Sequence, residues 1–531
     1  MAYRQLSILL QAARFSTSWV ILVIFVMLGI ALTGVLQIFQ LSISERLQQR
    51  IFARASFEFA FRLPRLRMES VHNEYVPELV NRFFDTLSIQ KGLSKILIDF
   101  SSATLQVFFG LLLLSFYHPF FIFFGLILLL IVYLIFRITG PRGLSTSLSE
   151  SKYKFEVVHW LEEVGRNMET FKLAGNTQMH ITKTDELVSG YIDARKKHFN
   201  VLVVQYINMV SFKLVVAAGL LIMGSLLVID QQINLGQFVA AEIVILLIIA
   251  SVEKLILSME TIYDVLTSLE KMGAVTDLPL EKSDGVLFEE VDKTAGMSVE
   301  LKNLSFRYAD SKEDVIRNFS VKIDSGERVC LSGYSGSGKS TMLQIIAGLY
   351  NDFTGILSYN DIPVGNLNLQ SLRTYIGDSI NEEKLFLGSL YENISLGRPG
   401  ITLKNVIEVA EKVFLTDFVQ NLRDGFETQI DPEGKNLPGS VVTKIMLARS
   451  LACPNRLLLV TDQLNRLDPK ERNSIMDYMI DKKNPWTLIV ISNQAEVAEK
   501  CDRVIIMDKG ELLANSPLLK LQDRNMFYSS N

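Results

Sequence analysis

The sequence predicts two parts of different class: an α-helical transmembrane domain of about five spans, followed by an α/β domain with a phosphate-binding loop. Three observations support this division. Long uncharged runs occupy the N-terminal half, and 49% of the 531 residues are hydrophobic, which is high for a soluble protein. Strand-like and helix-like runs alternate in the C-terminal half, as they do around a largely parallel sheet. A glycine-rich motif at residues 333–340 stands between one such strand and one such helix.

Uncharged runs predict five membrane spans. The run Trp19–Leu41 is long enough, at 1.5 Å per residue, to cross a hydrocarbon core of about 30 Å. The run Phe100–Phe136 is nearly twice as long as one span requires, and we expect the His-Pro pair at positions 118–119 to divide it into two. Asn200–Ile229 and Phe238–Val252 give two further spans, which a short polar turn separates.

Basic residues set the expected orientation of these spans. They gather between the first and second spans and again between the third and fourth, so we expect both segments, and the C-terminal half, to be cytosolic. The N-terminus then lies outside, although Arg4 and Arg14 oppose that placement; residues 5–16 could instead form an interfacial amphipathic helix. The basic residues used are Arg46, Arg50, Arg54, Arg62, Arg65, Arg67, Arg82, Lys91, Arg142, Lys152, Lys154, Arg166, Lys172, Lys183, Arg195, Lys196 and Lys197.

Two ionisable residues interrupt the predicted spans, Lys213 and Glu242. Charged groups at membrane depth are candidates for a substrate path. The alternatives are structural. Lys213 could extend its side chain to the cytosolic headgroups, and Glu242, about 6 Å inside the outer end of its span, could reach the outer headgroups.

Whole-chain composition narrows the function classes. The net charge of −4 is small, and so gives no electrostatic reason to expect a nucleic-acid partner. The three cysteines, Cys330, Cys453 and Cys501, have no C-x-x-C spacing, which is typical of reduced cytosolic residues. No cleavable signal sequence is evident, because the first apolar run is long enough to span the membrane and remain there.

Residues Gly333–Ser340 fit G-x-x-x-x-G-K-[ST] at every fixed position, between an apolar strand-like run and a helix-like run. Glycines let the backbone wrap around an anion, so that N–H groups and the helix N-terminus face phosphates. Lys339 is expected to reach the β- and γ-phosphates and Ser340 to bind Mg²⁺. The alternative, an accidental Gly/Ser-rich turn, would not require the flanking strand and helix. The candidate phosphate-contacting residues are Gly333, Ser335, Gly336, Ser337, Gly338, Lys339, Ser340 and Thr341.

On this motif and its flanks, the chain resembles an ABC transporter of the exporter type, with fused transmembrane and nucleotide-binding domains. The resemblance spans nearly the whole chain. It implies a transmembrane domain over residues 1–271, a polar linker over residues 272–297, and an ATP-binding cassette of the α/β P-loop NTPase class over residues 298–531. ATP and Mg²⁺ are the implied cofactors and ATP hydrolysis coupled to transport the implied activity. The resemblance also implies contact with membrane lipid in an inner (plasma) membrane. It implies assembly as a homodimer or as a heterodimer with another half-transporter.

Two further motifs match the family. Tyr308, in Phe306-Arg-Tyr308, occupies the position of the aromatic residue that stacks on adenine, an interaction worth about 1 to 3 kcal/mol. The alternative is a strand tyrosine packed in the core. The run Arg456–Asp462 resembles the Walker B motif, so Asp462 is expected to hold Mg²⁺ through water. The family usually places Glu after this carboxylate, and here Gln463 stands instead. An amide can bind the attacking water but cannot accept its proton.

Three more motif positions depart from the family. Asn381 replaces the Q-loop glutamine, and Asn493, which carries no positive charge, replaces the switch histidine. The signature Leu-Ser-Gly-Gly-Gln appears as Leu437–Val441, where Pro438 has neither a hydroxyl nor an N–H for the γ-phosphate. We therefore expect nucleotide binding with weakened hydrolysis, with Gln463 and Asn493 at the catalytic positions. The signature residues expected to face nucleotide are Pro438, Gly439 and Ser440, beside Asn381.

The family pattern also bears on the membrane half. Exporters of this kind usually carry six spans, and the tract after the first run of this chain matches the tract after the second span of the family. The resemblance therefore suggests that the first span is missing. The loops around Leu63–Val71 and Glu163–Phe171 fall where the family has coupling helices. Two functions remain open: a transport subunit for an unknown substrate, and a nucleotide-gated regulatory or structural component that does not pump. A fast ATPase would need catalytic groups that this sequence lacks.

Overall fold

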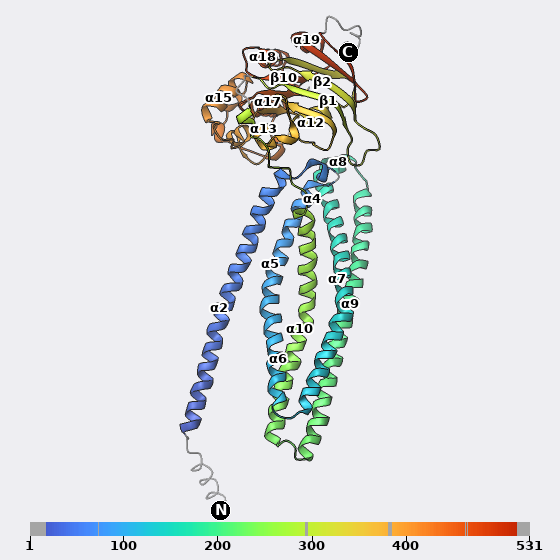
Figure 1. The fold of residues 1–531 in the computed structure, drawn as a ribbon, viewed down its shortest axis with the longest axis vertical. Coiled ribbons are helices and arrows are strands. Elements are labelled where there is room, and N and C mark those ends of the chain that lie inside the picture. The colour runs from blue at the N-terminus through green and yellow to red at the C-terminus, as the bar shows by residue number, and fades with distance from the viewer. Residues whose placement is uncertain are drawn as a thin grey trace, which may run out of the picture. The chain divides into compact units, whose positions relative to one another are not determined.

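The computed structural model describes residues 17–72, 74–291, 296–380, 385–461, 464 and 466–517. Contacts divide the chain into two compact units (Figure 1). The helical unit comprises Met1–Pro64 and Tyr75–Leu278. The α/β unit comprises Arg65–Glu74 and Pro279–Asn531. The chain therefore enters the α/β unit twice, once for a ten-residue excursion and once for its C-terminal half.

Within the described residues, five helical stretches of the helical unit are long and apolar enough to cross a membrane, which confirms the number of predicted spans. The expected break at positions 118–119 is also confirmed, because α6 ends at Ser115 and α7 begins at Phe120. The elements are α2 (Thr17–Arg62), α4 (Val76–Asn81), η2 (Arg82–Phe84), α5 (Asp85–Lys95), the π-helix η3 (Ile96–Phe100), α6 (Ser101–Ser115), α7 (Phe120–Arg166), α8 (Met168–Leu173), α9 (Met179–Ile229) and α10 (Leu235–Thr276). Residues 5–16, proposed as an interfacial helix, lie outside the described residues.

These helices are longer than the spans that they contain. The 51 residues of α9 amount to about 77 Å, more than twice the thickness of a bilayer core. Uncharged runs mark only the apolar part of each helix, and the polar ends continue it without a break. For the same reason α10 runs on to Thr276, past residue 272, where we expected the linker to begin.

The core of the helical unit joins α6, α7, α9 and α10. Apolar side chains such as Leu114, Phe121 and Ile245 are buried there. A polar cluster is also buried: the Gln205 amide donates to the Tyr263 hydroxyl at 2.6 Å and to the Thr139 hydroxyl at 3.1 Å. Each of these buried polar groups thus has a partner, which lowers the cost of removing it from water.

Lys213 is paired within the helical unit. Its ammonium lies 2.6 Å from the Glu253 carboxylate, and the neighbouring Lys254 lies 2.8 Å from Asp99. These two ion pairs join α9 to α10 and α10 to η3. The pairing gives Lys213 a structural role that neither the substrate path nor the headgroup contact had included. Glu242 is half-buried on α10.

The main sheet of the α/β unit has six strands in the order β12-β11-β3-β10-β9-β6. Among the strands that the structure describes, the five from β11 to β6 are parallel and β12 is antiparallel, which confirms the predicted largely parallel sheet. The strands are β3 (Arg328–Gly333), β6 (Ile376–Ser379), β9 (Leu457–Val460), β10 (Thr487–Ile491), β11 (Arg503–Asp508) and β12 (Glu511–Ser516). In a parallel sheet the carboxyl ends meet at one edge, where ligands usually bind.

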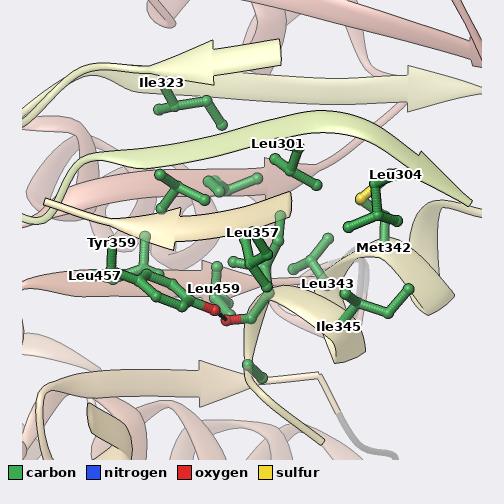
Figure 2. Close-up of a cluster of buried hydrophobic side chains, with 14 of the residues drawn as sticks. Leu301, Leu304, Ile323, Met342, Leu343, Ile345, Leu357, Tyr359, Leu457 and Leu459 are labelled. Carbon is green, nitrogen blue, oxygen red and sulfur yellow. Dashed lines mark hydrogen bonds between the residues drawn. The ribbon is translucent and has the colours of Figure 1, made fainter. Parts of the chain in front are cut away.

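A second, antiparallel sheet of the α/β unit has the strand order β2-β1-β4-β5. Figure 2 shows the apolar side chains that its strands share with α12 and the main sheet, among them Leu301, Leu357 and Leu343. The elements are β1 (Val299–Phe306), β2 (Ile316–Ile323), β4 (Thr354–Tyr359), β5 (Ile362–Pro363) and α12 (Lys339–Ile346). This sheet holds β1, which leads into Tyr308, against the helix that follows the phosphate loop.

The remaining elements form the helical region of the α/β unit. Most of them pack into a second apolar cluster around the helix α17, whereas the elements between residues 288 and 374 contribute Phe288, Val364, Leu369 and Leu372 to the cluster that the two sheets share. They are α11 (Phe288–Val291), η4 (Val364–Asn366), α13 (Leu369–Thr374), the short pair β7 (Gly388–Ser389) and β8 (Gln429–Ile430), α14 (Leu390–Ser395), α15 (Leu403–Lys412), α16 (Thr416–Gln420), η5 (Gly425–Glu427), η6 (Pro432–Gly434), α17 (Gly439–Leu451), α18 (Pro469–Ile480) and α19 (Ala495–Lys500).

The excursion Arg65–Glu74 contains the short helix α3 (Met68–Val71). Its entry is paired with the chain near Pro279: the Arg67 N–H donates to the Pro279 carbonyl at 3.1 Å, and the Glu281 N–H donates to the Arg65 carbonyl at 2.8 Å. Most of the expected coupling segment Leu63–Val71 thus belongs to the α/β unit. Glu163–Phe171 lies in the helical unit, and its coupling role stays a prediction.

Candidate functional site

The phosphate loop connects β3 directly to α12, in the strand-loop-helix order expected from the motif. Gly333 and Gly338 have φ angles of +146° and +97°, a region that side chains disfavour. A Cβ atom on Gly333 would lie 2.2 Å from the Met507 carbonyl oxygen, so no other residue fits there. Both glycines are therefore required by the backbone path, and the loop is not an accidental turn.

Lys339, the first residue of α12, folds its ammonium back over the loop. The Nζ atom donates to the carbonyl oxygens of Gly333 and Tyr334 at 2.7 Å each, and lies 3.3 Å from the Ser337 hydroxyl. These contacts hold a positive charge at the mouth of the loop. Ser337 is buried. Of the candidate phosphate-contacting residues, Ser335, Gly336 and Ser340 are exposed to solvent.

Asn493 lies beside the start of this loop. It follows β10, which runs parallel to β3. The Asn493 oxygen Oδ1 accepts hydrogen bonds from the Ser332 hydroxyl at 2.9 Å and from the Gly333 N–H at 3.3 Å. The structure therefore brings the expected switch position to the phosphate loop, and the amide oxygen is directed at the protein.

Tyr308 contacts the helix α12, which follows the phosphate loop. Its hydroxyl lies 2.9 Å from the Thr341 hydroxyl and donates to the Gln344 side-chain oxygen at 3.4 Å. The ring is partly buried at the edge of the apolar cluster, while Phe306 is fully buried within it. Tyr308 is thus at the rim of the core and next to the phosphate-loop helix, and Thr341 contacts this tyrosine.

The signature segment leads into the first turn of helix α17. Pro438 precedes α17 with an extended backbone (φ −57°, ψ 141°), and its carbonyl accepts from the Val441 and Val442 N–H groups. The N–H groups of Gly439 and Ser440, in the first turn, have no acceptor within the helix. They suit an anion, and Gly439 is exposed with open space around it.

Three expected site residues, Asn381, Asp462 and Gln463, lie outside the described residues. The strands that lead towards them are described. β6 ends at Ser379 and β9 at Val460, and these two are register partners in the parallel sheet. Both strand ends fall on the carboxyl edge of the sheet that carries the phosphate loop.

A buried charge cluster underlies β6. Burial raises the pKa of the Asp378 carboxyl, and the nearby Arg398 and Arg449 guanidinium groups oppose that rise. Arg449, on α17, donates from Nε to the Asn393 carbonyl at 2.8 Å. The cluster ties the strand before Asn381 to the helix of the signature segment.

Sequence reasoning missed three residues of this region. Ser332 immediately precedes the motif, and only the parallel pairing of β3 and β10 brings it to Asn493. Tyr350 follows α12 and meets Tyr308 edge to face, with ring centroids 5.5 Å apart. His72 stacks on Tyr308, with centroids 4.5 Å apart and planes at 9°. The signal for His72 was its place one residue beyond the expected coupling segment.

Comparison with known proteins is consistent with this geometry. The family profile described as "ABC transporter" matches residues 316–463, and the one described as "ABC transporter transmembrane region" matches residues 5–252. A solved structure of a bacterial Atm1-family ABC exporter with ATP bound superposes with a TM-score of 0.85 at 20% identity, over 99% of this chain and 92% of that chain.

Among curated proteins, the chain is similar to the "Alpha-hemolysin translocation ATP-binding protein HlyB" of Escherichia coli O157:H7, with 28% identity over 355 residues, 66% of this chain and 49% of the relative. The "Leukotoxin translocation ATP-binding protein LktB" of Mannheimia glucosida is 29% identical over 310 residues, 58% of this chain and 43% of the relative. The chain thus spans about half the length of these relatives. Both profiles match within one chain, and this protein belongs to the ABC transporters as a fusion of an exporter-type transmembrane region and an ATP-binding cassette.

Proposed function

We propose that this chain is one half of a dimeric ABC exporter that binds Mg·ATP at the phosphate loop, hydrolyses it slowly, and couples closure of two cassettes to export of a substrate. In this proposal residues 1–271 form the transmembrane domain and residues 298–531 the cassette, in an inner (plasma) membrane. The observation that carries it is the pre-shaped loop, in which Lys339 is already held at the carbonyls of Gly333 and Tyr334.

Nucleotide binding uses groups that the chain retains. The Lys339 ammonium and the N–H groups from Gly336 to Ser340 meet the phosphate charge, an arrangement in which charge-assisted hydrogen bonds act together. Tyr308 supplies a face for the adenine base. Ser340, in the first turn of α12, and Asp462 would hold Mg²⁺, which when bound neutralises phosphate charge. The hydroxyl and carboxylate of these two residues are the oxygen ligands that Mg²⁺ prefers.

Hydrolysis relies on positions that have changed. Gln463 can orient a water molecule but cannot take its proton, and loss of a general base costs about 10² to 10⁴ in rate. The amide oxygen of Asn493 accepts hydrogen bonds from Ser332 and Gly333, so only its amide nitrogen remains to donate to a phosphate oxygen. Pro438 removes one hydroxyl and one N–H from the signature. These groups act on one step, and their effects do not simply add.

A partner chain completes each nucleotide site in the proposed dimer. The phosphate loop and residue 463 come from one chain, and the signature segment from the other. In a homodimer both sites carry every replacement. In a heterodimer one site has Gln463 and Asn493, while the other has Pro438 facing the partner's catalytic groups. By their names, the curated relatives translocate protein toxins, and export is the activity that we carry over to this chain.

A second function is favoured by the same replacements. A nucleotide-gated regulatory or structural component would bind ATP, dimerise and hold a membrane complex in one state without pumping. Gln463, Asn493 and Pro438 suit it, because a slowly hydrolysed nucleotide keeps such a switch closed. The two functions are separated by transport assays in vesicles: ATP-dependent accumulation of substrate belongs only to the exporter.

The test of nucleotide binding is a titration of the protein in lipid nanodiscs with labelled Mg·ATP. Lys339→Ala removes the ammonium and is expected to weaken binding by at least about tenfold, the effect of one charge-assisted hydrogen bond. Lys500→Ala, which breaks an exposed ion pair with Asp477, is the matched control and should bind normally. Unchanged affinity in Lys339→Ala would refute the site.

A further inference from the structure

His72 and Tyr308 form an aromatic stack inside the α/β unit. Their ring centroids are 4.5 Å apart and their planes differ by 9°, so His72 covers one face of the tyrosine ring. Tyr350 meets both rings edge to face, at 5.5 Å from Tyr308 and 6.4 Å from His72. Aromatic pairs of these geometries contribute free energy beyond the burial of their surface.

Tyr308 is therefore fixed at two points. Its hydroxyl contacts the Thr341 hydroxyl on the phosphate-loop helix, and its ring lies against His72. A phenol ring that turned about its Cα–Cβ bond would lose both contacts. Because His72 covers one face of this ring, a base that stacks on Tyr308 must use the opposite face.

The position of His72 is fixed in turn by α3. Glu69, on that helix, accepts hydrogen bonds from the backbone N–H groups of Asn351 at 2.6 Å and Asp352 at 3.2 Å, immediately after Tyr350. The Met68 side chain packs against the same apolar cluster as Tyr308. The excursion Arg65–Glu74 is thus attached by a carboxylate, by an apolar side chain and by the ring of His72.

We propose that His72 is a positioning residue for the adenine base of ATP: its ring orients Tyr308 so that the opposite face of the tyrosine is presented to the base. This inference rests on the proposed function. It makes the loop that joins α2 to α4 a contributor to base binding, through one side chain that does not itself touch the nucleotide.

The expected size of the effect comes from the stack. Without His72, the Tyr308 ring adopts other orientations for part of the time. The apparent affinity for ATP is then the intrinsic affinity multiplied by the fraction of molecules in which Tyr308 is correctly oriented. An aromatic pair is worth about 0.5 to 1.5 kcal/mol, so His72→Ala should weaken ATP binding, by an amount that can reach about 2- to 12-fold. Binding of inorganic triphosphate, which has no base, should not change.

The experiment compares Mg·ATP and Mg·triphosphate binding to the full-length protein in nanodiscs. His72→Phe restores a stacking ring and should recover most of the lost ATP affinity. His118→Ala, a histidine at the turn between α6 and α7, is the matched control and should match wild type. In a double-mutant cycle, His72→Ala should add almost nothing to Tyr308→Ala, because His72 acts only through that ring.

Three results would overturn the inference: unchanged or tighter ATP binding in His72→Ala, an equal loss of ATP and triphosphate, or full additivity with Tyr308→Ala. The proposed function fails separately. If Lys339→Ala binds both ligands normally, the phosphate loop is not the nucleotide site. If Lys339→Ala loses both ligands and His72→Ala loses neither, nucleotide binding stands and only the role of His72 is wrong.

Discussion

The Asn493 oxygen Oδ1 lies 2.9 Å from the Ser332 hydroxyl, and this contact joins the ends of two adjacent parallel strands at the phosphate loop. The same oxygen accepts from the Gly333 N–H at 3.3 Å. A hydrogen-bond acceptor is therefore needed at this point, and the amide nitrogen is the only donor that the Asn493 side chain can offer to a phosphate.

Asn493→Asp tests that division of roles. The carboxylate keeps the shape and can still accept from Ser332 and Gly333, but it replaces the amide donor with a negative charge. We expect ATP binding to weaken by more than in Asn493→Ala, which loses a hydrogen bond worth about 0.5 to 1.5 kcal/mol. Affinities measured by ATP titration decide the matter. Equal binding by Asn493→Asp and wild type would show that residue 493 does not face phosphate.

Arg328 anchors the strand before the phosphate loop. Its side chain is only 1% exposed, and its guanidinium donates to five backbone carbonyls, those of Gly326, Ile480, Asp481, Asn484 and Trp486. Arg328→Met leaves these carbonyls without donors and should cost about 3 kcal/mol or more. For a domain of this size, that loss lowers Tm by about 6 to 12 °C.

Thermal unfolding of the purified protein measures this change. Arg328→Lys is the control for charge: it keeps the positive charge but offers three donors in place of five. We expect an intermediate Tm. A Tm for Arg328→Lys equal to that of wild type would mean that charge, and not the set of hydrogen bonds, stabilises the strand.

Cys453 gives a prediction that depends on pH. Burial raises the pKa of its thiol from 9.0 to about 11, with Arg398 acting in the opposite direction. The folded state therefore favours the neutral thiol, and the resulting stability is present below about pH 9 and lost as the pH rises through 11. At pH 8 only about one thiol in a thousand is ionised.

Alkylation followed by mass spectrometry checks this expectation. At pH 8, iodoacetamide should label Cys501, which is half-exposed, and leave the buried Cys330 and Cys453 unmodified until the protein is denatured. Labelling of Cys453 at the rate of Cys501 would contradict the buried, neutral thiol.

The membrane orientation is a separate prediction. With five spans and cytosolic basic segments, the N-terminus should face outside. In a background without native cysteines, a membrane-impermeant maleimide should label Ala2→Cys from outside. Gln232→Cys, in the turn after α9, is the external control, and Asn176→Cys, between α8 and α9, the cytosolic one. Labelling of Ala2→Cys only from the cytosolic side would mean that the first run does not cross or that a span was miscounted.

Much of the fold was predictable because its signals are local. Uncharged runs of fixed length, the proline at position 119, and the fixed spacing of Gly333, Gly338 and Lys339 each act on a few neighbouring residues. They predicted the five spans, the break between α6 and α7, and the strand-loop-helix unit. Alternating runs were enough to predict a largely parallel sheet.

The contacts that were missed join residues far apart in the sequence. The stack of His72 on Tyr308 needs the excursion Arg65–Glu74 to pack on residues more than two hundred positions later in the chain, and no local pattern indicates that. The ion pair of Lys213 and Glu253 requires the register between α9 and α10. The polar ends of the long helices were missed, because an uncharged run indicates only the part of a helix that faces lipid. The roles of Asn381, Asp462 and Gln463 stay predictions.

The most direct test of weakened hydrolysis measures phosphate release from the purified protein in lipid. We compare wild type with Gln463→Glu, Asn493→His, Pro438→Ser and the triple variant. Wild type should turn over slowly and each single variant modestly faster, because the other replacements still impair the same step. The triple should exceed the sum of the single gains, since groups that act as a unit are not additive. Wild-type turnover of about 1 to 10³ per second would contradict weakened hydrolysis. A triple variant that is no faster than wild type would contradict the assignment of the defect to these three residues.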